Sequence, residues 1–309
     1  MNDFLEKFPQ IGHLPVDTWG ALRDQIEAFQ GDEWVFRGQA DSQWTLKSSI
    51  ERCSSGIETV AKAQSVIEEF KQRAHIFTPD GYEPRNTVEW LSLMQQHGAP
   101  TRFLDFTESP YIAAYFAIEG CHEYESAALY AINRFWLRRR LLELLSGIRK
   151  TYSNLYTFQL TQNLYEFRSN LVQSFETLTT DSRISAVLPI EVPRPNRRQI
   201  AQKGVYLCAN DLNISFEECL TGAEPNVVKG NIHKIIVPSA IQAEALYSLR
   251  KLNIERATLF PDLDGFGGSL KDYLKEWSHR KELIERGAGN SVLFSSTMSQ
   301  EPDKGHQQP

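Results

Sequence analysis

The residues best suited to bind an anion are an arginine, a glycine and a glutamine that directly follow an apolar stretch near the N-terminus. Residues 34–36, Trp-Val-Phe, have the aromatic and β-branched character of a buried strand. Arg37 then presents a planar fork of donors, and Gly38 allows a ligand or another backbone to approach closely. The pattern predicts a strand whose end offers Arg37 and Gln39 to an anion at the floor of a cleft. The alternative is an arginine that reaches solvent from an edge strand or pairs with a carboxylate in the core.

A second polar segment lies around a short apolar stretch at residues 103–106, which is expected to be a strand. A helix is expected to begin at Ser109-Pro110, since proline is favoured at the first helical position. His97 precedes Gly98 at the end of another predicted helix, where it is either a structural residue or a ligand contact. Asp105 is expected to pair with Arg37 or Arg102, either across a cleft or as part of the scaffold.

Two motifs together resemble the FRG domain, a family named for its Phe-Arg-Gly signature. They are Trp-x-Phe-Arg-Gly-Gln at 34–39 and Gln-His-Gly-x-Pro-Thr-Arg-x-Leu-Asp-x-Thr-x-Ser-Pro-x-x-Ala-x-Tyr-Phe-Ala at 96–117. Two further segments are similar to the same family: Arg-x-x-x-Gln-x-Gly-Val-Tyr at 198–206 and Thr-Leu-Phe-Pro-Asp-Leu-Asp-Gly at 258–265. The resemblance therefore covers roughly residues 15–270.

The order of these motifs is also similar to that of the arginine-type ADP-ribosyltransferases. In that family an Arg closes the first strand, a Ser-Thr-Ser element precedes a packed helix, and a Glu-containing motif opens a later strand. This resemblance implies that Arg37 takes the Arg role and that Thr107 and Ser109 take the hydroxyl roles. It places Gln202 where the catalytic Glu is expected.

The resemblance to the transferases implies an enzyme that uses NAD to modify an unknown macromolecular acceptor, a protein or a nucleic acid. It also implies a bacterial toxin or a phage-defence effector as the setting. A guanidinium can hold a pyrophosphate through two hydrogen bonds, and hydroxyl groups can orient the ribose. The implied catalytic residues are Arg37, His97, Thr107, Ser109 and Gln202, and the implied NAD-binding residues are Arg37, Gly38, Gln39, Arg102 and Asp105.

Gln202 is the main departure from the transferase pattern. Its neutral amide can hydrogen-bond the ribose, but it lacks the charge that stabilises a developing cation. Either Glu108, Asp105 or Glu191 replaces the missing carboxylate, or catalysis is weak, or the site only binds. The alternative function is a non-catalytic module in which Arg37, His97 and Arg102 hold a nucleotide or another phosphorylated ligand. A purely structural protein is the third possibility.

Composition narrows the class of protein. The chain has 309 residues and a net charge of −6, which argues against broad, non-specific binding to nucleic acid. Arg194, Arg197 and Arg198 form a small basic cluster, either a solvated surface or a guide for a phosphate-bearing substrate. The four cysteines lack the spacing of a metal site and are expected to be reduced. No apolar run is long enough to span a membrane, so a cytoplasmic protein without metal or membrane association is expected.

The predicted elements favour an α+β fold, with a mixed sheet core and flanking helices in an ADP-ribosyltransferase-like arrangement. An FRG domain is expected over residues 1–286, with a helical insertion or lid at about 134–185. Residues 287–309 are expected to be a disordered tail because they are rich in Gly, Ser, Gln and Pro. Further expectations are an extended linker at 189–195, a final strand at 257–260 and a structural turn at 265–268.

Overall fold

The computed structural model describes residues 16–31, 33–54, 58–78, 83–121, 124–146, 155, 163–222, 230–277 and 279–286. The predicted disordered tail lies outside the described residues. Six strands form one sheet in the order β4-β5-β2-β1-β3-β6. These strands are β1 (Trp34–Gln39), β2 (Phe103–Thr107), β3 (Ser126–Asn133), β4 (Val187–Ile190), β5 (Gly204–Ala209) and β6 (Ile232–Pro238).

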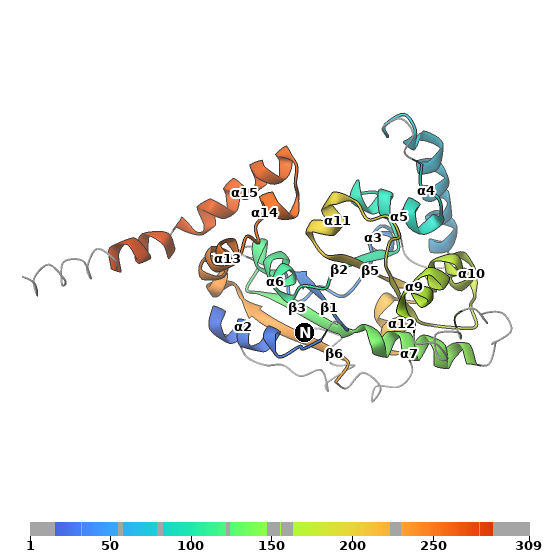
Figure 1. Cartoon of the computed structure of the whole chain (residues 1–309), viewed down its shortest axis with the longest axis horizontal. Coiled ribbons are helices and arrows are strands. Elements are labelled where there is room, and N and C mark those ends of the chain that lie inside the picture. Colours follow the sequence, from blue (N-terminus) through green and yellow to red (C-terminus); the bar gives the residue numbers. More distant parts are fainter. Residues whose placement is uncertain are drawn as a thin grey trace, which may run out of the picture.

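The α+β class is confirmed, and Figure 1 shows helices on both sides of the sheet. The five strand pairings are all antiparallel, so the sheet is not mixed in direction. The described helices are α2 (Trp19–Glu27), α3 (Ser49–Cys53), α4 (Thr59–Ala74), α5 (Thr87–Gln96), α6 (Pro110–Glu119), α7 (Arg134–Leu145), α9 (Leu164–Gln173), α10 (Phe175–Thr180), α11 (Arg197–Ala201), α12 (Phe216–Thr221), the 3-10 helix η4 (Ser239–Ile241), α13 (Gln242–Lys251), α14 (Arg256–Leu259) and α15 (Leu263–Lys275).

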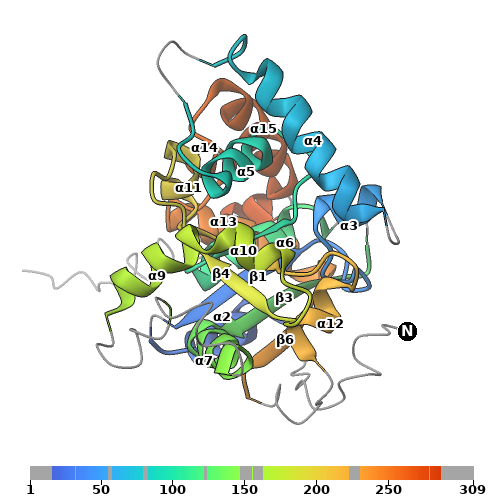
Figure 2. The same cartoon turned by 90° about the vertical axis from the view of Figure 1, so that its right-hand side faces the viewer.

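Two groups of helices cover different halves of the same side of the sheet. Helices α2, α6 and α13 pack on β1, β3 and β6 around Phe36. Helices α5, α9 and α10 pack on β2, β4 and β5 around Phe103. Phe36 is paired with Thr107, and Phe103 lies an even number of residues from Thr107, so both apolar clusters face the same side. Figure 2 looks onto the β4 edge, where α9 and α10 lie over the strand.

The sheet opens between β1 and β2. Strand β1 pairs with β3 along all of its length, but with β2 only at Phe36 and Thr107. Strand β2 pairs with β5 along all of its length. The backbone from Arg37 to Gln39 therefore separates from the first residues of β2. The gap that results lies between the two groups of helices.

Helix α6 packs directly on the separated end of β1. A Cβ atom added at Gly38 would lie 2.1 Å from the carbonyl oxygen of Ala113 and 2.3 Å from the backbone nitrogen of Ala117. The backbone that approaches Gly38 is thus that of α6, and the buried Ala113, Ala114 and Ala117 of this helix leave room for the close contact. Ser109 caps α6 and Pro110 opens it, as the sequence predicts.

Three local predictions differ from the structure. Residues 256–259 are the helix α14 rather than a strand, because Glu255 and Thr258 form a reciprocal capping box at its start. Residues 265–268 lie inside α15 rather than in a turn, since Asp262 accepts a hydrogen bond from the Gly265 backbone. The predicted linker at 189–195 overlaps β4.

The segment expected as a helical insertion or lid is helical in its described parts. Its helices α9 and α10 belong to the core, however, because Phe167, Leu171, Phe175 and Leu178 are buried in the cluster around Phe103. Their apolar faces are continuous with the sheet, so neither helix has the character of a lid.

Gly38→Ala should destabilise the protein by about 1–3 kcal/mol or more, because the added methyl group overlaps the α6 backbone. Urea denaturation measures this free energy of unfolding. Gly267→Ala in α15 is the matched control, since nothing lies within 4 Å of the added atom. It should leave stability unchanged or raise it by up to about 1 kcal/mol. Equal effects of the two substitutions would contradict the close packing of α6 on β1.

Candidate functional site

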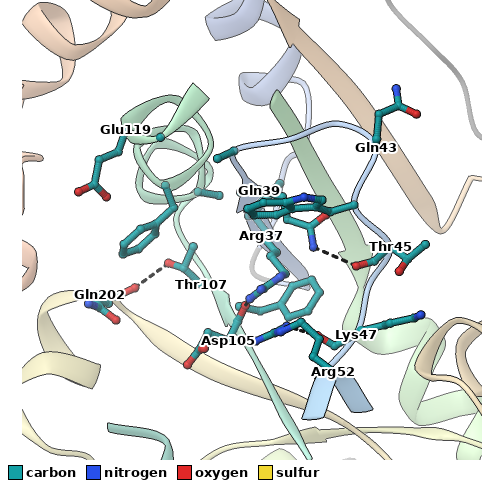
Figure 3. A pocket seen from close by; sticks show the side chains of 18 of the residues that line it. Arg37, Gln39, Gln43, Thr45, Lys47, Arg52, Asp105, Thr107, Glu119 and Gln202 are labelled. Atoms are coloured by element: carbon teal, nitrogen blue, oxygen red, sulfur yellow. Dashed lines mark hydrogen bonds between the residues drawn. The ribbon is translucent and has the colours of Figure 1, made fainter. Parts of the chain in front are cut away.

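A cleft of about 880 Å³ opens where β1 separates from β2. Its floor is formed by the end of β1 and by Asp105, Phe106 and Thr107 of β2. Its walls come from the loop after β1, from α6, and from residues of α11 and α15. Figure 3 shows the side chains that converge there.

Arg37 bridges the gap between the two strands. Its Nη1 donates a hydrogen bond of 2.7 Å to the backbone carbonyl of Asp105, while its Nε is buried and has no hydrogen-bond partner. The predicted pairing of Arg37 with Asp105 therefore occurs through the backbone and not through the carboxylate. Burial lowers the pKa of Arg37, the charge of Asp105 opposes this shift, and the nearby Arg52 adds to it.

Cationic side chains outnumber acidic ones in the cleft, although the chain as a whole is acidic. The cations are Arg37, Lys47, Arg52, Arg198 and Lys275, and the acids are Asp105 and Glu119. Several cations are fixed by local contacts that leave their charge in place. Arg52 donates to the carbonyl of Lys47 at 2.6 Å, and the Arg198 guanidinium carbon lies 4.3 Å from the centre of the Phe260 ring. The cleft is thus a positively charged region suited to an anion.

The two acids have different surroundings. The Asp105 carboxylate accepts a hydrogen bond of 2.7 Å from Gln95 and faces the cleft. Glu119 forms an ion pair with Arg256, and burial raises the pKa of this carboxyl. Of the three acids considered as substitutes for a catalytic Glu, Asp105 lines the cleft.

The other two substitutes, Glu108 and Glu191, lie elsewhere. Both form ion pairs with the buried Arg134, at 2.8 Å and 3.2 Å respectively. Glu191 also pairs with Arg168 at 2.8 Å. Neither carboxylate is among the described groups that line the cleft, so their charges are used in a buried ion-pair network.

Thr107 and Gln202, which lie far apart in the sequence, are neighbours in the structure (Figure 3). Both residues line the cleft. The Thr107 hydroxyl donates to the Gln202 carbonyl at 2.7 Å and accepts from the Ser109 backbone at 3.0 Å. The Ser109 hydroxyl accepts from the Ile112 backbone at 3.3 Å and caps α6. Both hydroxyl groups therefore hold the local backbone in place. Ser109 is not among the residues that line the cleft.

The Gln202 side chain also has a defined partner. Its Nε2 donates to the carbonyl of Leu259 in α14 at 3.1 Å, so the amide joins the end of α11 to the C-terminal helices. A small neighbouring cavity of about 50 Å³ is also lined by Gln202, together with Asp105 and Arg198.

Two predicted site residues lie away from the cleft. His97 is exposed at the C-terminal end of α5 and is not among the described residues that line the cleft. Arg102 donates to the carbonyl of Asn210 at 3.2 Å and does not line the cleft either. Within the predicted basic cluster, Arg194 pairs with Glu89, whereas Arg198 contributes to the cleft.

Sequence reasoning missed Trp44, Lys47, Arg52, Glu119 and Lys275, all of which line the cleft. Trp44 is notable because 46% of its surface is exposed beside a charged cleft. Trp44 and Lys47 follow the Arg-Gly-Gln motif closely, and this proximity is a signal that could have identified them. Lys275 reaches the site only because α15 packs against α6, and no local sequence pattern predicts that contact.

The sequence profile of the FRG domain matches residues 32–126. This segment of the chain is therefore similar to the FRG domain. The match is shorter than the expected range of 15–270, but it includes the cleft-lining part of β1, the loop after it, β2 and α6. Arg198, Gln202 and Lys275 lie C-terminal to the matched segment. No curated protein and no solved structure matches the chain at a significant level.

Within the described part of the chain, no helix combines the length and apolar composition needed to cross a membrane. The described residues also contain no group of three or more His, Cys, Asp or Glu side chains placed to hold a metal ion.

Thr107→Val should lower the free energy of unfolding by about 1–3 kcal/mol, because it leaves the Gln202 carbonyl and the Ser109 amide without their partner. Thr107→Ser keeps the hydroxyl and should cost less. Urea denaturation of both variants tests the assignment. Equal stability of the valine variant and the wild type would show that these two hydrogen bonds do not hold the site together.

Proposed function

We propose that the cleft binds a nucleotide that carries phosphate groups, and that NAD is the ligand to test first. The observation that carries the proposal is Arg37. Its side chain is half-buried in the cleft wall, its Nε is buried without a hydrogen-bond partner, and no described carboxylate forms an ion pair with it. A buried charge of this kind is costly unless an anion completes its environment.

The phosphate groups would lie between Arg37 and Arg52. Arg52 is close enough for its charge to lower the pKa of Arg37, and no described carboxylate forms an ion pair with either guanidinium. Two like charges repel each other unless a shared anion lies between them, and a pyrophosphate offers several oxygens to both. Lys47 lies beside the pair in Figure 3 and adds a third positive charge.

The remaining cleft suits the uncharged parts of such a ligand. The exposed ring of Trp44 offers a surface on which a base can stack, and Phe116 adds an apolar wall. Gln39 has a buried side-chain oxygen without a partner, which can accept a hydrogen bond from an amide or a base. A volume of about 880 Å³ lies within the range of cofactor-binding sites.

NAD should stabilise the wild-type protein by about 2.7 kcal/mol at 100 times its dissociation constant. Arg37→Lys should remove most of this stabilisation, because an ammonium group cannot reach Asp105 and present the same fork to a phosphate. Calorimetric titration with NAD, together with thermal unfolding, gives both quantities. Arg23→Lys on the exposed surface of α2 is the matched control and should bind NAD normally. A wild-type melting temperature that millimolar NAD does not change would reject NAD as the ligand.

Transfer of ADP-ribose from bound NAD is the second candidate function, and the position of Asp105 favours it. In such a reaction the bond between nicotinamide and ribose breaks, and nicotinamide leaves with the electron pair. An acceptor nucleophile forms the new bond to the ribose carbon and loses a proton. A carboxylate in the cleft would stabilise the positive charge that develops on the ribose. Asp105 supplies such a carboxylate, whereas Gln202 does not.

Asp105→Asn should reduce nicotinamide release by about 100-fold or more if Asp105 stabilises this charge, while NAD binding stays within a few-fold of wild type. Release is measured with purified protein, with and without cell extract as a source of acceptor. Glu108→Gln is the control, because this neighbouring carboxylate pairs with Arg134 outside the cleft. NAD binding without nicotinamide release by the wild type would leave the cleft as a binding site only.

A further inference from the structure

The loop that follows β1, residues 40–47, forms one wall of the cleft and is called the cleft loop here. It contributes Trp44 and Lys47, together with Ala40, Gln43 and Thr45. It contains neither helix nor strand, so no regular hydrogen-bond ladder holds its backbone. Its conformation therefore depends on bonds to the elements behind it.

Those bonds come from several elements. Gln39 of β1, Tyr130 of β3 and Arg52 of α3 donate to the carbonyls of Thr45, Trp44 and Lys47, and three further bonds tie the loop to β3, α12 and β6. The Ser42 backbone donates to the Ser126 carbonyl at 2.8 Å, at the start of β3. The Leu46 backbone donates at 2.8 Å to the carboxylate of Glu217, which lies in α12. The third bond comes from β6, where Lys234 donates through Nζ to the Ser42 carbonyl at 2.7 Å.

Lys234 is an unusual residue for its position. Its side chain is fully buried, with 0% of its surface exposed, and its Nζ lies 5.2 Å from the centre of the Tyr130 ring on the paired strand β3. An apolar side chain of similar length would fill the same space without removing a charge from water. What the ammonium adds is a charge-assisted hydrogen bond to the cleft loop, which is about twice as strong as a neutral one.

We propose that Lys234 is a positioning residue for the ligand cleft, and that its ammonium group holds the cleft loop in the conformation in which Trp44 and Lys47 line the site. Lys234 does not itself line the cleft and acts through the Ser42 carbonyl. The relevance to ligand binding rests on the proposed function, whereas the effect on the loop does not.

The charge state of Lys234 gives the inference a distinctive pH dependence. Burial lowers the pKa of Lys234 to about 8, and the charged groups that face it, Glu217 and Asp41, oppose this shift. Above that pH the neutral amine makes a weaker bond to the Ser42 carbonyl, so the cleft loop loosens. Between this pKa of about 8 and the ordinary lysine pKa of 10.5, Lys234 is largely neutral in the folded protein but still protonated in the unfolded chain. The contribution of Lys234 to the free energy of unfolding of the whole protein therefore rises with pH, while the cleft loop itself loosens.

The first experiment is hydrogen exchange on the ligand-free protein. Lys234→Met should lower the protection factors of the cleft-loop amides by about tenfold, the effect of losing one hydrogen bond to a charged group. The amides of β5 should not change, and the urea midpoint should be equal or higher. Raising the pH from 7 to 9 should loosen the loop in the wild type but not in Lys234→Met. Lys271→Met, on the exposed side of α15, is the matched control and should behave as the wild type.

The second experiment measures NAD affinity in the same variants, and Lys234→Met should bind about tenfold more weakly than the wild type. If the wild type does not bind NAD, the proposed ligand is wrong, but the exchange data still decide the role of Lys234. Unchanged loop protection in Lys234→Met, or a general loss of protection that includes β5, would overturn the inference whatever the result with NAD.

Discussion

The separation of β1 from β2 is the constraint on which the cleft depends. Two neighbouring antiparallel strands normally pair along their shared length, but here pairing stops after Phe36 and Thr107. The contact of α6 with Gly38 fixes the path of β1 beyond this point, since any side chain there would overlap the helix backbone. The Asp105 carbonyl, which faces the gap, receives its hydrogen bond from the Arg37 guanidinium instead of from a β1 amide. The same arginine therefore completes the backbone bonding and brings a positive charge into the opening.

Two groups of buried or partly buried arginines show why the charge in the cleft points to a ligand. Directly after the last residue of β2, Arg134 and Arg168 are matched by Glu108 and Glu191, so that region is close to neutral. The end of β1 has more positive than negative charge, because Arg37 lies beside Arg52 and no described carboxylate forms an ion pair with Arg37. A chain with a net charge of −6 has enough acids to neutralise both regions. This excess of positive charge is the observation on which the proposed anionic ligand rests.

Local sequence patterns predicted the elements that build the site. The strands at Phe36 and Phe106 follow from apolar and β-branched residues, and the start of α6 follows from the Ser-Pro pair. The same reasoning failed at α14, where Thr-Leu-Phe has the composition of a strand but a capping box fixes a helix. It also placed His97 and Arg102 at the site, because motif membership does not show where a side chain points. Glu119 and Lys275 reach the cleft through tertiary packing alone, and no spacing in the sequence encodes that contact.

The surroundings of Gln202 give its amide a structural role at the position where the resemblance to the transferases led us to expect a carboxylate. The Gln202 Nε2 donates to the Leu259 carbonyl, and this bond ties α11 to α14 at the edge of the cleft. A glutamate there would place two acceptors against each other and remove the donor that the Leu259 carbonyl uses. The amide is therefore required by the local structure, whatever chemistry takes place in the cleft. Among the described carboxylates that line the cleft, Asp105 is the one whose backbone carbonyl binds Arg37 on the cleft floor.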